Sequence, residues 1–245
     1  MEVLVVGAGA VGRWVAETVA APVAFADTDP QRAVAAADAT ENARAVAVDT
    51  AASFAVVAVA VPMRAAGAAI DAHAAAAERA IVDFTGVMDE PLAAMAAAGP
   101  PGVERASFHP LFAPAHAPGR IAVTDGDGGP TVDRLRGWLA DAGNELVEVP
   151  AAVHDDAMET IQGRTHAAIL AFALAADDVP DALATPVYEE LSRLADRVTG
   201  GTPGVYADIQ SAFGGSQEVA AAADRIAAAA AGDGDAFAEV YEDAS

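Results

Sequence analysis

Three glycines near the N-terminus have the spacing of a dinucleotide-binding loop. Gly7, Gly9 and Gly12 follow a short aliphatic run and precede an alanine-rich stretch typical of a helix. The first glycine permits a tight turn, the second lets the backbone approach a pyrophosphate, and the third lets helix and strand pack closely. The alternative is a glycine-rich turn without a ligand. The residues expected to bind the cofactor here are Gly7, Gly9, Ala10, Val11 and Gly12, together with Pro62, which follows a later predicted strand.

Asp27 ends the second predicted strand. A carboxylate there can accept hydrogen bonds from the hydroxyls of an adenosine ribose and repels a 2′-phosphate. No arginine follows directly, because the next residues are Thr28, Asp29 and Pro30. These residues favour NAD over NADP as the cofactor. The alternative is that Asp27 or Asp29 caps a helix.

His109 lies in the run Ser-Phe-His-Pro, at the carboxyl end of a strand predicted over residues 103–107. Open α/β sheets bind their ligands at this end of the strands. An imidazole, with an ordinary pKa of about 6.5, can accept or donate a proton near neutral pH. We therefore predict a catalytic role for His109; the alternative is a loop histidine that bonds a nearby carbonyl.

A later helix carries polar groups at steps of four. His154, Met158, Gln162 and His166 lie broadly on one of its faces. The segment lacks the His-Glu-x-x-His pattern and its acids lie off this face, so no metal site is predicted. Farther on, two arginines lie four positions apart, at 193 and 197. A buried arginine needs a carboxylate partner, which the protein or a substrate could provide.

The elements that must position these residues form two domains. Residues 1–150 alternate β-branched runs with helical stretches, which predicts an α/β Rossmann-type doubly wound sheet. The expected strands are residues 2–6, 23–26, 45–48, 54–61, 80–84, 103–107 and 145–149, with a Gly/Asp/Pro stretch at 124–130. Residues 151–245 show no convincing strand, which predicts an all-α domain.

The helical domain is expected to pair with a second copy of the chain. Residues 151–176 could form one helix about 39 Å long, at ~1.5 Å per residue. That is long for a domain of this size standing alone, and long apolar helices usually pack on a partner. We therefore predict a homodimer formed through residues 151–245.

Composition excludes several classes of protein. The 245 residues are 54 % hydrophobic, which excludes a disordered acidic chain. The net charge is −23, so we predict that the protein does not bind nucleic acid. All 13 basic residues are arginine, and this lysine-free, acidic composition indicates a halophilic host. There is no cysteine, no long apolar run and no basic leader at the N-terminus. We therefore expect a cytoplasmic protein without disulfides, without a membrane span and outside oxidising compartments.

Four segments, in order, resemble the prephenate dehydrogenases of tyrosine biosynthesis, the TyrA family. They are GAGAVG, SFHPLFAP, HDDAMETIQGRTH and TPVYEELSRLADRVTGGTPGVYADI. The second is similar to the family's His-Pro-Met-Phe-Gly-Pro loop, and the third to its His-Asp-x-x-Met-x-x-x-Gln-x-x-x-His helix. These segments span most of the chain.

The resemblance implies an NAD-dependent oxidative decarboxylation of prephenate to 4-hydroxyphenylpyruvate. His109 would accept the proton of the ring hydroxyl, and Arg197 would bind a substrate carboxylate. His166 and Gln162 would lie near the substrate and the nicotinamide. Glu189 stands where some members carry a second arginine, and Arg193 has no counterpart in the family.

The family's motif Asp-x-x-Ser-Val-Lys reads Asp-Phe-Thr-Gly-Val-Met at residues 83–88. In relatives the serine is a hydrogen-bonding neighbour of the catalytic histidine, and Gly86 replaces it here. Thr85 or Ser107 could substitute for it, and Thr85 is taken as a candidate substrate-binding residue.

Other readings stay open. Arogenate is an alternative substrate, and Gly86 and Glu189 also allow an NAD-sensing relative without turnover. The β-hydroxyacid dehydrogenases share the expected architecture but depend on a lysine, and this chain has none. Imine reductases such as pyrroline-5-carboxylate reductase need no such lysine, but they leave the His-Pro loop and Arg197 unexplained.

Overall fold

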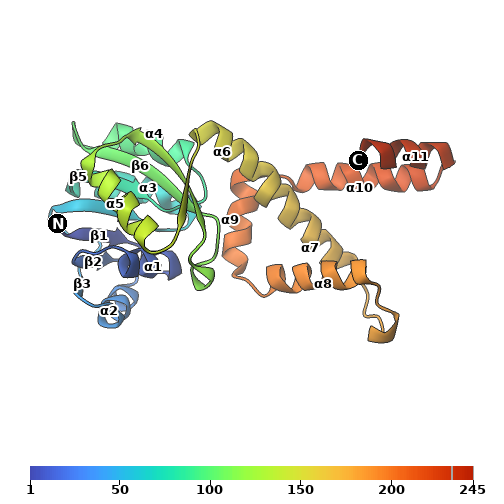
Figure 1. Cartoon of the computed structure of the whole chain (residues 1–245), viewed down its shortest axis with the longest axis horizontal. Helices are drawn as coiled ribbons and strands as arrows, with labels where there is room; N and C mark the ends of the chain where they lie inside the picture. Colours follow the sequence, from blue (N-terminus) through green and yellow to red (C-terminus); the bar gives the residue numbers. More distant parts are fainter. Residues whose placement is uncertain (233, 245) are drawn as a thin grey trace. The chain divides into compact units, whose positions relative to one another are not determined.

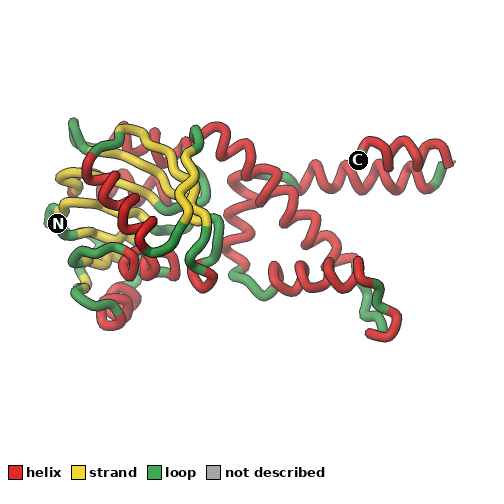
Figure 2. Tube along the Cα trace, viewed as in Figure 1, coloured by secondary structure: helices red, strands yellow, loops and turns green. Residues whose placement is uncertain are grey.

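The computed structural model describes residues 1–232 and 234–244 and divides into two compact units. The first unit comprises Met1–Asp155 and the second Asp156–Ser245. Strands occur in the first unit, and the described part of the second contains helices and loops only (Figure 2). The division falls inside a helix, five residues beyond the end of the domain expected at residue 150, because the first turn of that helix packs on the sheet unit.

The first unit is built on one sheet (Figure 1). Its eight strands have the order β3-β2-β1-β4-β5-β6-β7-β8. The first six strands in this order run parallel to one another, and their order is that of a doubly wound dinucleotide-binding sheet. β7 runs antiparallel to β6, and β8 is parallel to β7. The strands are β1 (Val3–Val6), β2 (Val23–Ala26), β3 (Ala43–Ala45), β4 (Phe54–Val59), β5 (Ala77–Asp83), β6 (Glu104–Pro110), β7 (Arg120–Asp127) and β8 (Glu145–Glu148).

Helices cover both faces of the sheet, as the alternating pattern predicts. One face packs on α1 (Ala10–Thr18), α2 (Pro30–Ala39) and α5 (Pro130–Asp141), and the other packs on α3 (Ala66–His73) and α4 (Asp89–Ala98). The central strands are buried on both sides, because β1 and β4 are aliphatic or aromatic throughout. The predicted doubly wound α/β fold is confirmed.

Several expected boundaries were wrong. β5 begins at Ala77 and not at residue 80, and β6 ends at Pro110 and not at residue 107, which places His109 inside the strand.

Two further differences concern a whole segment and a short strand. Residues 124–130, which were expected to be a loop, are largely part of β7, since Thr124 and Asp125 pair with Ser107 and Ala106 of β6. The strand expected at residues 45–48 is β3, and it ends at Ala45. In both places pairing with a neighbouring strand decides the element, and local composition does not report that pairing.

The second unit is helical in its described part. It contains most of the helical stretch that begins with α6 (Ala151–Met158), continues as the π-helical segment Glu159–Arg164 and ends as α7 (Thr165–Ala175). A small core joins α7 to the next helices through Ile169, Ala195 and Val198. The remaining helices are α8 (Pro186–Thr199), α9 (Pro203–Phe213), α10 (Ser216–Ala230) and α11 (Gly234–Asp243), with a short 3₁₀ helix at Asp181–Leu183.

In residues 1–232 and 234–244, no helix is both long enough and apolar enough to cross a membrane.

Candidate functional site

The candidate functional residues of the first unit lie in or directly after the carboxyl-terminal ends of neighbouring strands. Val6 of β1 is in register with Val59 of β4, Val59 with Asp83 of β5, and Asp83 with Ser107 of β6. The glycine loop follows Val6 directly, and His109 lies two residues beyond Ser107. Three strand spacings of ~4.8 Å therefore separate β1 from β6 along one edge of the sheet.

The glycine loop has the shape that a bound pyrophosphate needs. Gly7 has φ +102°, and a Cβ on Gly12 would lie 1.9 Å from the carbonyl oxygen of Gly7, so both positions require glycine. A Cβ on Gly9 would meet nothing within 4 Å. Gly9 is the N-cap of α1 and offers no side chain to the amides of the first turn, so these amides can bond an anion. The loop residues therefore fit a dinucleotide.

Asp27 links the end of β2 to this loop. Its carboxylate accepts hydrogen bonds from the amide of Ala8 at 2.8 Å and from the amide of Asp29 at 2.9 Å. Asp29, and not Asp27, is the N-cap of α2, where it accepts a bond from the amide of Gln31. Pro62 follows β4 and begins the short 3₁₀ helix Met63–Ala65. The role of Asp27 toward a ribose stays a prediction.

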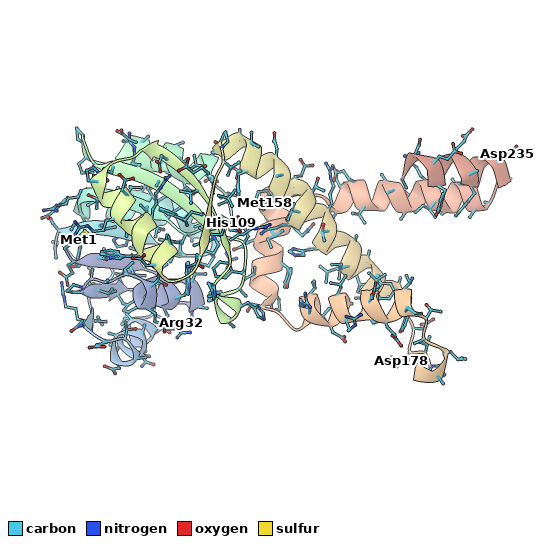
Figure 3. The ribbon with its side chains drawn as sticks, viewed as in Figure 1. Met1, Arg32, His109, Met158, Asp178 and Asp235 are labelled. Carbon is cyan, nitrogen blue, oxygen red and sulfur yellow. The ribbon has the colours of Figure 1, made fainter. Side chains whose placement is uncertain are left out.

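His109 is a buried imidazole near the end of β6 (Figure 3). Its Nδ1 atom lies 2.9 Å from Nε2 of His154, and the two rings meet edge to face. Only 7 % of His109 is exposed. The pKa of His109 is lowered to about 3, mainly by burial and also by His154, while the charge of Asp155 acts in the opposite direction. The ring is therefore neutral near physiological pH, so one of its two nitrogens is a hydrogen-bond acceptor.

Asp155 ends the group that begins at His109. Its Oδ1 atom lies 2.7 Å from Nδ1 of His154 and 3.0 Å from the amide nitrogen of Met88, and its Oδ2 atom accepts the amide of Asp89 at 3.1 Å. Burial alone raises the pKa of Asp155, but the bonds from His154 and the two amides outweigh it and lower the pKa. Asp155 is therefore a carboxylate.

Asp83 and Thr85 form a second buried group at the end of β5. Both the amide and the hydroxyl of Thr85 bond Oδ2 of Asp83, at 2.9 and 2.6 Å. Burial raises the pKa of Asp83 to about 6, against the opposing effect of the Thr85 and Ser107 hydroxyls. A Cβ on Gly86 would lie 2.7 Å from Sδ of Met63, so a serine at that position would displace the methionine.

The remaining predicted site residues belong to the second unit. Gln162 lies in the π-helical segment, His166 in α7, and Arg197 in the last turn of α8. His166 packs edge to face on Tyr206, and burial lowers its pKa. Arg197 is exposed and makes no ion pair with any described residue of the chain.

The structure adds two residues to the candidate site that the sequence analysis had not assigned to it. His154 and Asp155 are adjacent in sequence, and the sequence analysis placed His154 only on a polar helix face. Their proximity to His109 depends on a contact between residues 45 positions apart. The described residues contain no cluster of three or more His, Asp or Glu side chains arranged to hold a metal ion.

No protein-family model matches the chain. A 4-amino-4-deoxyprephenate dehydrogenase from Streptomyces pristinaespiralis is 38 % identical over 129 residues, which cover 47 % of this chain and 42 % of that protein. A probable arogenate/prephenate dehydrogenase from Methanocaldococcus jannaschii is 26 % identical over 143 residues, covering 53 % of this chain and 32 % of that protein. Both relatives are therefore named as dehydrogenases of prephenate or of compounds related to it. These matches span less than half of either relative's length.

Solved structures share the fold. Prephenate dehydrogenase from Aquifex aeolicus has a TM-score of 0.70 at 13 % identity and covers 99 % of this chain and 96 % of its own. The same enzyme in complex with hydroxyphenyl propionate and NAD+ has a TM-score of 0.63 at 15 % identity, covering 91 % and 87 %. A 3-hydroxyisobutyrate dehydrogenase from Salmonella typhimurium has a TM-score of 0.61 at 16 % identity, covering 91 % and 94 %. The fold is therefore common to more than one class of dehydrogenase.

Proposed function

We propose that this chain is an NAD-dependent prephenate dehydrogenase that oxidises and decarboxylates prephenate to 4-hydroxyphenylpyruvate. Support comes from its prephenate and arogenate dehydrogenase homologues and from a structural neighbour that binds NAD+. The observation that carries the proposal is the buried, neutral imidazole of His109 on the same sheet edge as an open glycine loop.

NAD fits the residues of the loop. Gly7, Gly9, Ala10, Val11 and Gly12 would surround the pyrophosphate, with the first-turn amides of α1 donating to its oxygens. Asp27 would accept bonds from the adenosine ribose, and Pro62 would border the cofactor after β4. When bound, NAD supplies the hydride acceptor.

His109 accepts the proton of the ring hydroxyl and later returns it. That proton moves to the imidazole as the carbon–oxygen bond gains double-bond character, which drives the hydride from the same carbon. Loss of CO₂ from the ring then gives a phenolate, and His109 returns the proton to its oxygen. The product is aromatic, so the reaction does not reverse.

Residues of the second unit would hold the substrate. Arg197, without an ion-pair partner in the described chain, would bind a substrate carboxylate by paired hydrogen bonds. Gln162 and His166 would contact the substrate near the nicotinamide, and Thr85 would contribute from β5. These roles are part of the proposal.

A substrate with an amine on the ring is a second candidate. The 38 % identical relative from Streptomyces pristinaespiralis is a 4-amino-4-deoxyprephenate dehydrogenase. The same imidazole can accept a hydrogen bond from a ring amine as well as from a ring hydroxyl. Arogenate, which differs from prephenate in the side chain, is a further alternative substrate.

Two other functions are weaker candidates. A β-hydroxyacid dehydrogenase shares the fold, but those enzymes depend on a lysine and this chain has none. An NAD-sensing protein without turnover would retain the glycine loop and Asp27, but it would not need a buried neutral imidazole at the sheet edge.

The decisive assay is NADH formation by the purified chain in molar KCl with NAD and prephenate, then with arogenate and with 4-amino-4-deoxyprephenate. We expect turnover with prephenate, and His109→Asn should lower kcat by roughly 10²–10⁴-fold while NAD binding persists. The matched control is His116→Asn, a change at an exposed histidine at the end of the short 3₁₀ helix Pro114–His116. NAD binding without turnover on any of the three substrates would contradict the proposal and favour the sensor.

We further propose a cytoplasmic homodimer from a halophilic host. The absence of cysteine suits a reducing compartment, and the charge of −23 without lysine suits high salt. Pairing through the second unit is supported by apolar side chains left exposed there, such as Leu174 at 88 % and Val187 at 75 %. Light scattering at several protein concentrations measures the mass directly.

A further inference from the structure

Three side chains of the first unit form one hydrogen-bonded series. The carboxylate of Asp155 is bonded to Nδ1 of His154, and Nε2 of His154 is bonded to Nδ1 of His109. The series joins the first turns of α6 to the end of β6. His154 is 2 % exposed, so water does not compete for its two nitrogens.

The donors and acceptors of this series assign the tautomers of both rings. An ionised carboxylate can only accept, so His154 donates to it from Nδ1, and in the neutral form of His154 the Nε2 atom is then an acceptor. The bond between the rings then requires His109 to donate from Nδ1. A neutral His109 with its proton on Nδ1 carries its basic lone pair on Nε2.

We propose that His154 and Asp155 are positioning residues that hold His109 in the tautomer with a basic Nε2 atom. The inference rests on the proposed function, because this is the tautomer that can accept a proton from the substrate's ring hydroxyl. Neither residue needs to touch the substrate. Asp155 sets the proton on His154, and His154 sets the proton on His109.

Backbone amides hold Asp155 at one end of the series and fix the direction of its hydrogen bonds. The amides of Met88 and Asp89 donate to its carboxylate, which fixes the carboxylate where α4 begins. These amides can only donate, so Asp155 accepts from them and from Nδ1 of His154 alike. Its negative charge also favours the imidazolium that His109 becomes after taking the proton.

The series also accounts for Gly86. The resemblance places a serine there that bonds the catalytic histidine, and here the position is glycine against Met63. Thr85 uses its hydroxyl on Asp83 and on the carbonyl of Val87. His154 occupies the Nδ1 side of His109, so the ring is oriented without a serine at position 86.

The sharpest test is Asp155→Asn. Both amides reach Oδ2 of Asp155, that of Met88 at 3.3 Å and that of Asp89 at 3.1 Å. In Asp155→Asn the side-chain oxygen at this position can accept from both, which turns the NH₂ group toward His154. His154 must then accept at Nδ1 and donate from Nε2, and the proton of His109 moves to its Nε2 atom. The fold is kept, but the base faces the wrong way.

Two measurements read this change. ¹⁵N NMR of the full chain with labelled histidine reports the tautomer of His109, assigned by the signal lost in His109→Asn. We expect Nδ1–H in the native chain and Nε2–H in Asp155→Asn, with kcat lowered roughly 10²–10⁴-fold at similar KM. Asp155→Glu, which keeps the carboxylate, should restore the Nδ1–H signal and part of kcat. Asp156→Asn, at the exposed neighbouring position, should change neither.

The outcomes separate this inference from the proposed function. An Nε2–H signal for His109 in the native chain overturns the inference even if no variant folds. So does an Asp155→Asn chain with the native tautomer, whether its kcat is unchanged or falls only with its melting temperature. The expected tautomers without turnover on any substrate would support the positioning role and contradict the proposed function instead.

Discussion

Nδ1 of His109 and Nε2 of His154 lie 2.9 Å apart, so one hydrogen bond joins a strand residue to a helix residue 45 positions later. The bond lies within the unit formed by Met1–Asp155. The first turns of α6 therefore pack as part of the first unit, and they supply the residue that contacts the imidazole of His109.

The glycine loop offers a matched pair of substitutions. Gly9→Ala should leave the melting temperature nearly unchanged, because its Cβ meets nothing within 4 Å, yet it should weaken NAD binding by filling the space for the pyrophosphate. Gly12→Ala should destabilise the chain by about 1–3 kcal/mol or more, because its Cβ would overlap the carbonyl oxygen of Gly7. Calorimetric titration with NAD and thermal melts measure both. Native NAD affinity in Gly9→Ala would mean that the cofactor does not approach this residue.

Asp27 should set the choice of cofactor. The native chain should react faster with NAD than with NADP, because the carboxylate repels a 2′-phosphate. Hydrogen bonds to charged groups contribute about 1.5–3 kcal/mol, so Asp27→Asn should lower the ratio of kcat/KM values for NAD over NADP by roughly 10–100-fold. Asp29→Asn is the control, since asparagine caps a helix as well as aspartate does. A native chain that prefers NADP would refute the assignment.

Arg197 and Arg193 lie on the same helix and are both exposed, which makes one the control for the other. Arg197→Ala should raise the KM for the substrate by roughly 10–100-fold through loss of a charge-assisted pair. Arg193→Ala should leave KM at the native value. Steady-state rates with varied substrate at saturating NAD measure this. Equal effects of the two substitutions would remove the specific role of Arg197.

Asp83 should make stability depend on pH. Burial raises its pKa from 3.8 to about 6, so the native state keeps the proton over a range in which the unfolded chain has lost it. This contribution is fully present below pH 3.8 and is lost as the pH rises through 6. The stability of Asp83→Asn relative to the native chain should therefore rise between about pH 4 and pH 6 and stay constant above that, with a gain of at most about 3 kcal/mol. Urea unfolding at several pH values tests this, with the exposed Asp38→Asn as control. A pH-independent difference would contradict it.

Salt should stabilise the chain. The acidic side chains that give the net charge of −23 repel one another in the folded chain. Raising the ionic strength from 0.1 to 1 M shortens the screening length from about 10 to about 3 Å. The melting temperature should therefore rise with KCl over this range. A melting temperature that stays constant or falls would show that charge repulsion does not limit the stability of this fold.

The sequence alone determined the central sheet, the glycine loop and the position of His109 at a strand end. Each of these depends on a local pattern: an aliphatic strand of four residues, a spacing of glycines, and a His-Pro pair near the end of a predicted strand. Such patterns lie within a few residues, and the backbone preferences behind them act over the same range.

The tertiary structure decided what the local pattern could not. Residues 120–127 form a strand despite their Gly/Asp content because they pair with β6, where Arg105 also bonds Asp127. Likewise, neither the tautomer of His109 nor its depressed pKa can be read from its own segment. Both depend on burial and on a histidine 45 residues away, since hydrogen bonds and desolvation depend on distance in space and not on separation along the chain.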